Sequence, residues 1–218
     1  MDTAQLIKPG TLSIGTEVLQ WARTYLVIDN ENIHRPYGDS KAVCPFVKPS
    51  IEKDFFYMVF HPEIMGPYSG QIAQIMIQHI VDFETAEPFH PGEKNLKTLL
   101  VVFPGIPERE AYVLDHVQEN IKSSFVKRGL MIGQFHKRCE TPSVHNPAFH
   151  VSISPHPLMA IRYMQPHDIL FLKDGDDASW FDEYNRRFGE HFRDESKPNK
   201  ERAFLLELYK EAKRKFTK

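Results

Sequence analysis

The stretch GLMIGQFHKRCETPSVHNPAFHVSISPHPLMAIRYM, residues 129–164, decides how this chain folds. Its first part, residues 130–136, and its last part, residues 158–164, are apolar runs of the length of β-strands. The segment between them is rich in proline, which restricts regular structure and stiffens a loop. Four histidines lie in the stretch: His136, His145, His150 and His156. The pattern therefore predicts two strands joined by a rigid, histidine-rich loop that carries functional groups.

Further elements extend from this stretch in both directions. Residues 97–105 (KTLLVVFPG) are an uninterrupted apolar run, typical of a strand covered on both faces, and residues 55–62 predict another strand. Turn-forming residues fill positions 29–50, where we expect no regular structure. Apolar residues at helical spacing predict helices from Thr11 or Ser13 to about Val27, and over 69–84, 107–127, 166–172, 179–192 and 200–216.

The order of these elements predicts an α/β or α+β fold in a single layered domain, residues 1–218. We expect a central mixed sheet flanked by helices, with the core at about 40–172. A helical extension then follows at about 173–218. Gly129 is expected to end the helix before the first strand of the stretch in the left-handed conformation.

Composition narrows the classes of function. The formal net charge of −2 argues against a broad nucleic-acid surface, which needs a basic stripe. Two distant cysteines do not form a disulfide framework. No apolar run approaches the roughly 20 residues that span a bilayer, and the first residues lack a signal-peptide pattern. We expect a cytoplasmic protein, away from membranes, that binds a small molecule and forms a homodimer. Nucleotide-binding and common hydrolase motifs are absent.

His136 closes a predicted strand, where a rigid scaffold commonly positions a functional group beside an open loop. Its imidazole can bind a metal or act as a base, or its nitrogens can simply be satisfied by loop carbonyls. Cys139 follows at H-x-x-C spacing, so both side chains can reach one ion. With His145 and Cys44 they would complete a tetrahedral zinc site.

Two further residues have a functional and a structural interpretation. Cys44, in AVCPFV, is either an exposed thiolate ligand or a buried, inert cysteine. Arg162 lies inside an apolar strand, where its charge must be paired. It can bind a carboxylate such as a haem propionate, or form a structural ion pair with Asp168. His61 precedes a proline and marks a turn, and His79 reads as a satisfied core histidine.

The string GLMIGQFH-x-x-C-x-x-P-x-x-HNPAF, followed by SPHPLMAIRYM, resembles a bacterial domain family of unknown function found among biosynthetic enzymes. The likeness covers roughly residues 40–172. More remotely, Cys44-Pro45, the strand-end His136, and Asn146-Pro147 with Phe149 are similar in order to motifs of the YqcI/YcgG family. Some members of that family are haem-dependent N-hydroxylases.

This resemblance implies a haem-dependent oxygenase or N-hydroxylase that acts on a small polar, amine-containing substrate. His136 would be the proximal haem ligand, with Cys44 as the rival, and Arg138 would help to bind the cofactor. His145, His150 and Arg162 would face the substrate. Two alternatives stay open: a zinc-containing or metal-independent enzyme using the same His/Cys pocket, and a non-catalytic partner of a biosynthetic enzyme. The leading hypothesis requires His136 to share a cavity with the Cys44 loop.

Overall fold

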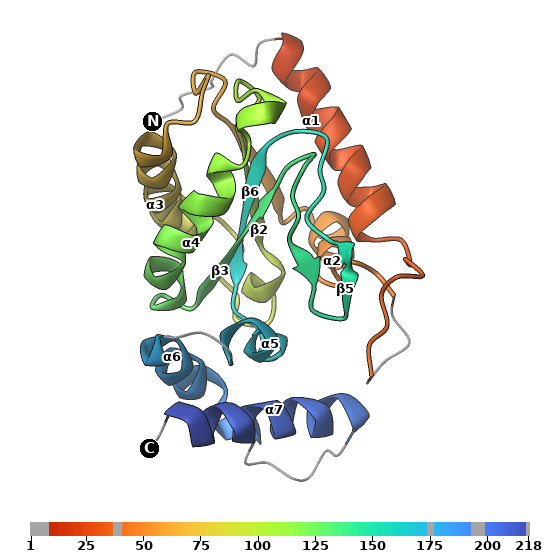
Figure 1. The fold of residues 1–218 in the computed structure, drawn as a ribbon, viewed down its shortest axis with the longest axis vertical. Coiled ribbons are helices and arrows are strands. Elements are labelled where there is room, and N and C mark those ends of the chain that lie inside the picture. The colour runs from red at the N-terminus through yellow and green to blue at the C-terminus, as the bar shows by residue number, and fades with distance from the viewer. Residues whose placement is uncertain (1–8, 37–40, 174–176, 193–198, 217–218) are drawn as a thin grey trace.

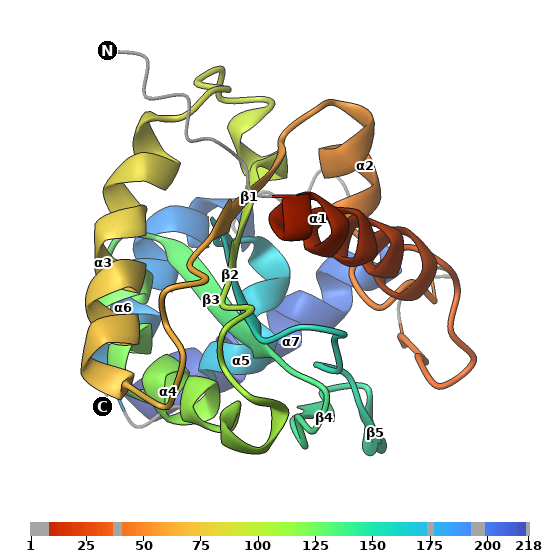
Figure 2. The same cartoon turned by 90° about the horizontal axis from the view of Figure 1, so that it is seen from above.

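A computed structural model describes residues 9–36, 41–173, 177–192 and 199–216. It confirms an α+β fold in which helices surround a mixed four-stranded sheet (Figure 1). Seen from above, α3 and α4 lie on one side of the sheet and α1 and α2 on the other (Figure 2). No helix in the described ranges is both long and apolar enough to cross a membrane.

The sheet has the order β1-β2-β6-β3, so β6 lies between β2 and β3 and β3 forms an edge. β1 and β2 run parallel, whereas β6 runs antiparallel to both β2 and β3. All five residues of β2 are buried, as its unbroken apolar sequence predicts for a strand covered on both faces. The strands are β1 (Phe56–Phe60), β2 (Thr98–Val102), β3 (Leu130–Phe135) and β6 (Leu158–Tyr163).

The helices pack on the two faces by the apolar stripes that the sequence predicts. α3 (Ser69–Thr85) and α4 (Val113–Val126) cover one face, and α1 (Pro9–Trp21) and α2 (Val47–Glu52) cover the other. Alternate residues along each strand serve the two faces, because successive strand side chains point in opposite directions. The buried stripe of α4 includes Leu114, Val117, Ile121 and Phe125.

The last helices form a second apolar cluster at one end of the sheet (Figure 1). They are α5 (Ile169–Leu172), α6 (Ala178–Phe188) and α7 (Lys200–Phe216). Met131, at the start of β3, belongs to this cluster and so connects it to the sheet. The C-terminal helices therefore hold the start of β3 in place.

Three predictions of local structure need correction, and one is confirmed. The first helix ends as a π-helical turn, Ala22–Leu26, and α2 begins inside the segment 29–50, which was expected to be irregular. The predicted loop after β3 contains a short hairpin of β4 (Pro142–Ser143) and β5 (Asn146–His150), with a register shift at Pro142. Prolines in such short strands leave few ladder hydrogen bonds, which hides the hairpin from pattern analysis. Gly129 has φ 71°, as predicted.

Candidate functional site

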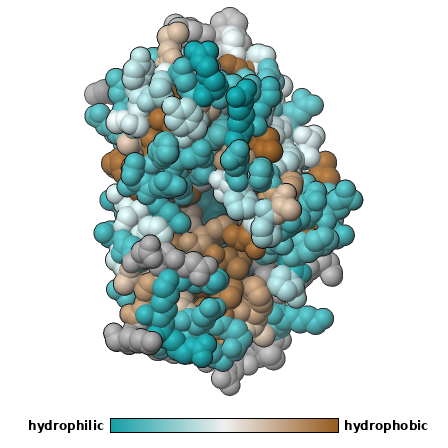
Figure 3. All heavy atoms as spheres, viewed as in Figure 1, coloured by the Kyte–Doolittle hydropathy of each residue, from teal (hydrophilic) through white to brown (hydrophobic). Residues whose placement is uncertain are grey.

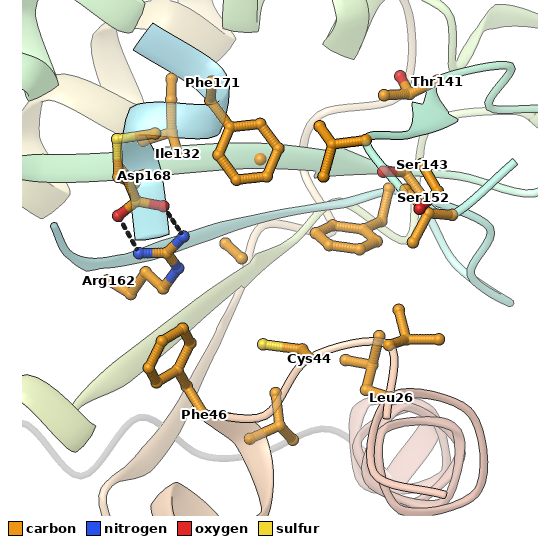
Figure 4. Close-up of a pocket in the computed structure, with 18 of the residues that line it drawn as sticks. Leu26, Cys44, Phe46, Ile132, Thr141, Ser143, Ser152, Arg162, Asp168 and Phe171 are labelled. Carbon is orange, nitrogen blue, oxygen red and sulfur yellow. Dashed lines mark hydrogen bonds and ion pairs between the residues drawn. The ribbon is translucent and has the colours of Figure 1, made fainter. Parts of the chain in front are cut away.

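One hollow, here called the main cavity, lies beside the edge strand β3, between the β4–β5 hairpin, α2 and α5. Its volume is about 300 Å³. In Figure 3, apolar side chains gather around a hollow near the middle of this face. Figure 4 shows Phe171 and Ile132 on one wall and Leu26, Cys44 and Phe46 on the other. The cavity is therefore suited to a ligand with a large apolar body.

One end of the main cavity carries a charged pair. Arg162 on β6 donates two hydrogen bonds to Asp168, of 2.7 and 2.6 Å (Figure 4). Asp168 is 1% exposed and also accepts from the backbone of Gln165, whereas 22% of the Arg162 side chain stays accessible at the cavity. Burial alone would lower the pKa of Arg162, but the Asp168 carboxylate outweighs it and the pKa is raised. Arg162 is thus a permanent cation beside an apolar space.

The thiol of Cys44 lies on the cavity wall between the charged end and the opposite, hydroxyl-bearing end (Figure 4). The backbone of Cys44 is fixed by a 2.9 Å hydrogen bond to the carbonyl of Leu26, at the end of the π-helical turn. Ser143 and Ser152 mark the hydroxyl end. His145 also lines the cavity, and burial, helped by the nearby Arg35, lowers its pKa.

A second hollow, here called the polar hollow, lies between α4 and the segment after β3 and has a volume of about 280 Å³. Its wall is built from charged and polar side chains: Glu108, Arg109, Tyr112, Asp115, His136, Arg138 and Glu140. Arg138, which we expected to help to bind a cofactor, lines this hollow and forms an ion pair of 2.9 Å with Glu108. This hollow is therefore suited to small polar or ionic species.

Asp115, His136 and Cys139 come together at the inner wall of the polar hollow, with one ligand atom from each within 4.8 Å of the others. His136 Nε2 lies 3.0 Å from Asp115 Oδ2, and Cys139 Sγ lies 3.6 Å from Asp115 Oδ1. His136 Nδ1 is buried without a partner, so the ring proton belongs on Nε2, where the carboxylate accepts it. Burial raises the pKa of Cys139, so its thiol stays protonated unless a cation displaces the proton.

The structure brings together only part of the predicted site. His136 lines the polar hollow and Cys44 the main cavity, so the expectation that they share one cavity is wrong. The cause is direction: the His136 ring turns toward Asp115 of α4, whereas the Cys44 loop lies on the opposite face of the sheet. The predicted zinc set is divided in the same way: Cys139 lies beside His136, whereas His145 and Cys44 line the main cavity.

His150 and Arg162 also differ in their placement. His150 is exposed on β5 and lines neither hollow, whereas Arg162 lies at the main cavity in the ion pair with Asp168 that the sequence offered as its structural interpretation. The sequence did not point to Asp115 or Phe171. Asp115 looks like an ordinary acidic residue in the first turn of α4, and Phe171 like part of an apolar helix stripe.

Comparisons with known proteins identify a family but no activity. No curated protein and no solved structure matches the chain. One family model does match, over residues 15–199, which include the whole sheet and both hollows. The chain therefore belongs to the family described as Domain of unknown function (DUF6875).

Proposed function

We propose that the protein is a haem-dependent oxidoreductase whose main cavity holds the cofactor, with the Cys44 thiolate as axial ligand. The observation that carries this proposal is a thiol placed on the wall of an apolar cavity that also contains a fixed cation, Arg162. Haem is a broad apolar ring with two carboxylates, and thiolate is one of its recognised protein ligands.

The donor set of the main cavity fits this group. Phe171 and Ile132 face Leu26 and Phe46 across the space, which suits an apolar ring. Arg162 can share its guanidinium between Asp168 and a propionate, because its side chain remains accessible at the cavity. Cys44 replaces His136 as the leading axial ligand, since His136 lies in the other hollow.

When bound, a haem supplies iron for oxygen chemistry, while the protein supplies ligation, shape and hydrogen bonds. The hydroxyl end of the cavity, with Ser143 and Ser152, offers hydrogen bonds to a small polar, amine-containing substrate. His145 lies there too, with its backbone bonded to Ser143, and burial lowers its pKa, so its imidazole stays neutral near pH 7 and can hydrogen-bond to the substrate. The family match assigns no reaction, so the class of reaction remains our proposal.

Haem titration of the purified protein tests the proposal. We expect one equivalent of haem to bind. After reduction and addition of carbon monoxide, the Soret band should have the position typical of thiolate ligation. Cys44→Ser should change that band, and Cys139→Ser, the matched control at the only other cysteine, should leave it unchanged. A protein that takes up no haem, or a Cys44→Ser spectrum identical to the wild type, would overturn the proposal.

A second function is favoured by one specific observation, the convergence of Asp115, His136 and Cys139. We propose as the alternative a zinc enzyme in which these three hold the ion and the polar hollow admits a water or substrate as the fourth ligand. Three protein ligands with one open position are typical of catalytic zinc. The zinc would displace the protons of His136 Nε2 and the Cys139 thiol.

The two cysteines serve as reciprocal controls for this alternative. Cobalt should give a thiolate-to-metal absorption band that disappears in Cys139→Ser and in Asp115→Asn but survives in Cys44→Ser. Zinc analysis of protein purified without chelator should show about one equivalent more in the wild type than in Cys139→Ser, as expected for a three-ligand site of this kind. Absence of the cobalt band in the wild type would exclude the zinc enzyme without affecting the haem proposal.

A further inference from the structure

Two histidines outside both hollows form a pair that neither proposal uses. His61 Nε2 lies 2.8 Å from His79 Nε2, and each ring bonds a carboxylate with its other nitrogen. His61 Nδ1 lies 2.7 Å from Glu63, and His79 Nδ1 lies 2.8 Å from Asp82. The four side chains thus form a continuous chain, carboxylate–imidazole–imidazole–carboxylate.

Two rigid elements position the pair. His61 follows the last residue of β1, and its backbone donates a 2.8 Å hydrogen bond to the carbonyl of Val102. His79 lies on α3, which packs against the same sheet through its buried stripe. The His61 ring also stacks on Phe103 at 5.8 Å. The side chains of His61 and His79 are 19% and 12% exposed, so the pair lies just below the surface and remains open to ions.

The outer carboxylates decide which nitrogens carry protons. An ionised carboxylate only accepts hydrogen bonds, so both Nδ1 atoms must donate to Glu63 and Asp82. Both Nε2 atoms then direct lone pairs at each other across 2.8 Å. A positive species must lie between them, either a shared proton or a metal ion. Metal-binding histidines characteristically donate their other ring N–H to a carboxylate, which is the arrangement found at both rings.

We propose that His61 and His79 form a zinc-binding site through their Nε2 atoms, oriented by Glu63 and Asp82. Two zinc–nitrogen bonds of about 2.0–2.1 Å at a tetrahedral angle place the nitrogens roughly 3.3 Å apart, whereas a linear ion needs roughly 4.1 Å. The observed 2.8 Å requires only a small ring displacement to reach the tetrahedral value. Zinc therefore fits better than a linearly coordinated ion.

The site has two protein ligands, because within the described parts of the chain no third His, Cys, Asp or Glu donor completes a set with this pair. Water or an incoming ligand fills the remaining two positions. Zinc here would join the end of β1 to α3, two elements whose contact otherwise depends on apolar packing. Because the ion binds only the folded arrangement, it should stabilise the protein in proportion to its concentration.

Zinc titration by calorimetry tests this site, in a Cys139→Ser background that removes the other metal cluster. We expect one equivalent to bind and to raise the melting temperature. His79→Ala and His61→Ala should abolish binding, and Asp82→Asn should weaken it by roughly 10- to 100-fold. His90→Ala, at an exposed histidine that also precedes a proline, is the matched control and should bind as the background does.

Nitrogen-15 NMR of the histidine-labelled Cys139→Ser protein gives a second measurement that needs no histidine variant. Zinc should shift two Nε2 resonances while their Nδ1 atoms stay protonated. If the pair responds to pH but not to zinc, it holds only a shared proton and the proposal is wrong. Equal zinc binding in the Cys139→Ser protein with and without His79→Ala would overturn it as well.

Discussion

The main cavity and the polar hollow lie close together along the chain yet differ in their chemistry. The segment after β3 contributes to both: Gln134 lines the main cavity, His136 and Arg138 line the polar hollow, and residues 141–145 return to the main cavity. One hollow has mainly apolar walls with a thiol and the Arg162–Asp168 ion pair, and the other is walled mostly by charged groups. Neighbours in sequence are thus sorted to different sites by the direction in which each side chain leaves the backbone.

This difference separates two kinds of cysteine and two kinds of histidine. Cys44 and His145 are placed for a large ligand with an apolar body, whereas Cys139 and His136 are placed for a small cation held with Asp115. Ligand binding in the main cavity and cation binding in the polar hollow can therefore be tested independently. A variant in one hollow should leave binding in the other intact. The following predictions test that separation, beginning with the largest expected effect.

Asp168→Asn should have the largest effect on stability. The substitution keeps the shape of the side chain but leaves the charge of Arg162 without its buried partner. Breaking a buried pair in this way costs about 3–5 kcal/mol in the free energy of unfolding. Urea denaturation monitored by circular dichroism measures the change.

The control for Asp168→Asn is Glu207→Gln, which removes an exposed ion pair with Lys210 on α7. Exposed pairs contribute little because water and salt screen them, so the denaturation midpoint should not move measurably. If Asp168→Asn lost less than about 1 kcal/mol, the pair at the main cavity would be behaving as a surface pair. The charged end of the cavity would then be open to solvent rather than built for a ligand.

Ala160→Leu should fill the main cavity and remove binding of an anionic apolar dye such as anilinonaphthalene sulfonate. Ala160 lines the cavity from the middle of β6, where it lies between Leu100 and Gly133 in the strand register. We expect dye affinity to fall by roughly tenfold, with a stability cost of about 1–3 kcal/mol. Fluorescence titration measures the affinity.

The matched variant for the dye experiment is Arg109→Ala, at an exposed side chain of the polar hollow. Its dye affinity should equal that of the wild type, because the apolar walls lie in the other hollow. Equal weakening by both substitutions would contradict the separation of the two sites. It would mean that the dye binds at a surface common to both.

The sequence predicts the fold better than it predicts the site. β2 and α4 could be located because burial on both faces produces an unbroken apolar run and burial on one face a helical stripe. The β4–β5 hairpin could not, since its strands are short and contain Pro142 and Pro147. The pairing of His136 with Asp115 depends on how α4 docks against β3, which no local pattern encodes.

The same reasoning explains the residues that were grouped wrongly. His136, Cys139, His145 and Cys44 have the composition of a zinc site, but composition carries no information about direction. The partner of Arg162 was easier to predict. A charge in an apolar strand must be paired, and Asp168 is the nearest acidic residue in the sequence. The His61–His79 contact joins a turn to a helix stripe, and each residue alone looks unremarkable.

The two thiols should react at different rates with a disulfide reagent. Cys139 is 1% exposed, and burial raises its pKa, so little thiolate is available for attack. Cys44 is only partly buried and opens to the main cavity. In native protein we expect Cys44 to react at least roughly tenfold faster than Cys139, and both to react equally in urea.

The single-cysteine variants assign these rates directly. Cys44→Ser should leave only the slow phase, and Cys139→Ser only the fast phase. A fast phase that persists in Cys44→Ser would show that the polar hollow opens to solvent often enough to expose its inner wall. The assignment of Cys139 as a buried ligand would then need revision.

The smallest expected effect is a pH dependence that originates in the main cavity. Burial lowers the pKa of His145 in the folded state below its ordinary value of about 6.5. As the pH falls below that value, the unfolded chain gains a proton at His145 while the folded protein does not. Stability should therefore decline as the pH falls from 7 through 6 and level off below the folded-state pKa.

His145→Asn removes this titrating group. The free energy of unfolding should therefore decline less between pH 7 and pH 5, and this difference should be smaller than the loss of stability in Asp168→Asn. His150→Asn is the control, because His150 lies on the neighbouring strand β5 but outside both hollows. Urea denaturation at several pH values measures both slopes. If the His150→Asn slope changed instead, the acid sensitivity would arise at the surface of the hairpin rather than in the cavity, and the neutral imidazole proposed for His145 would lose its physical basis.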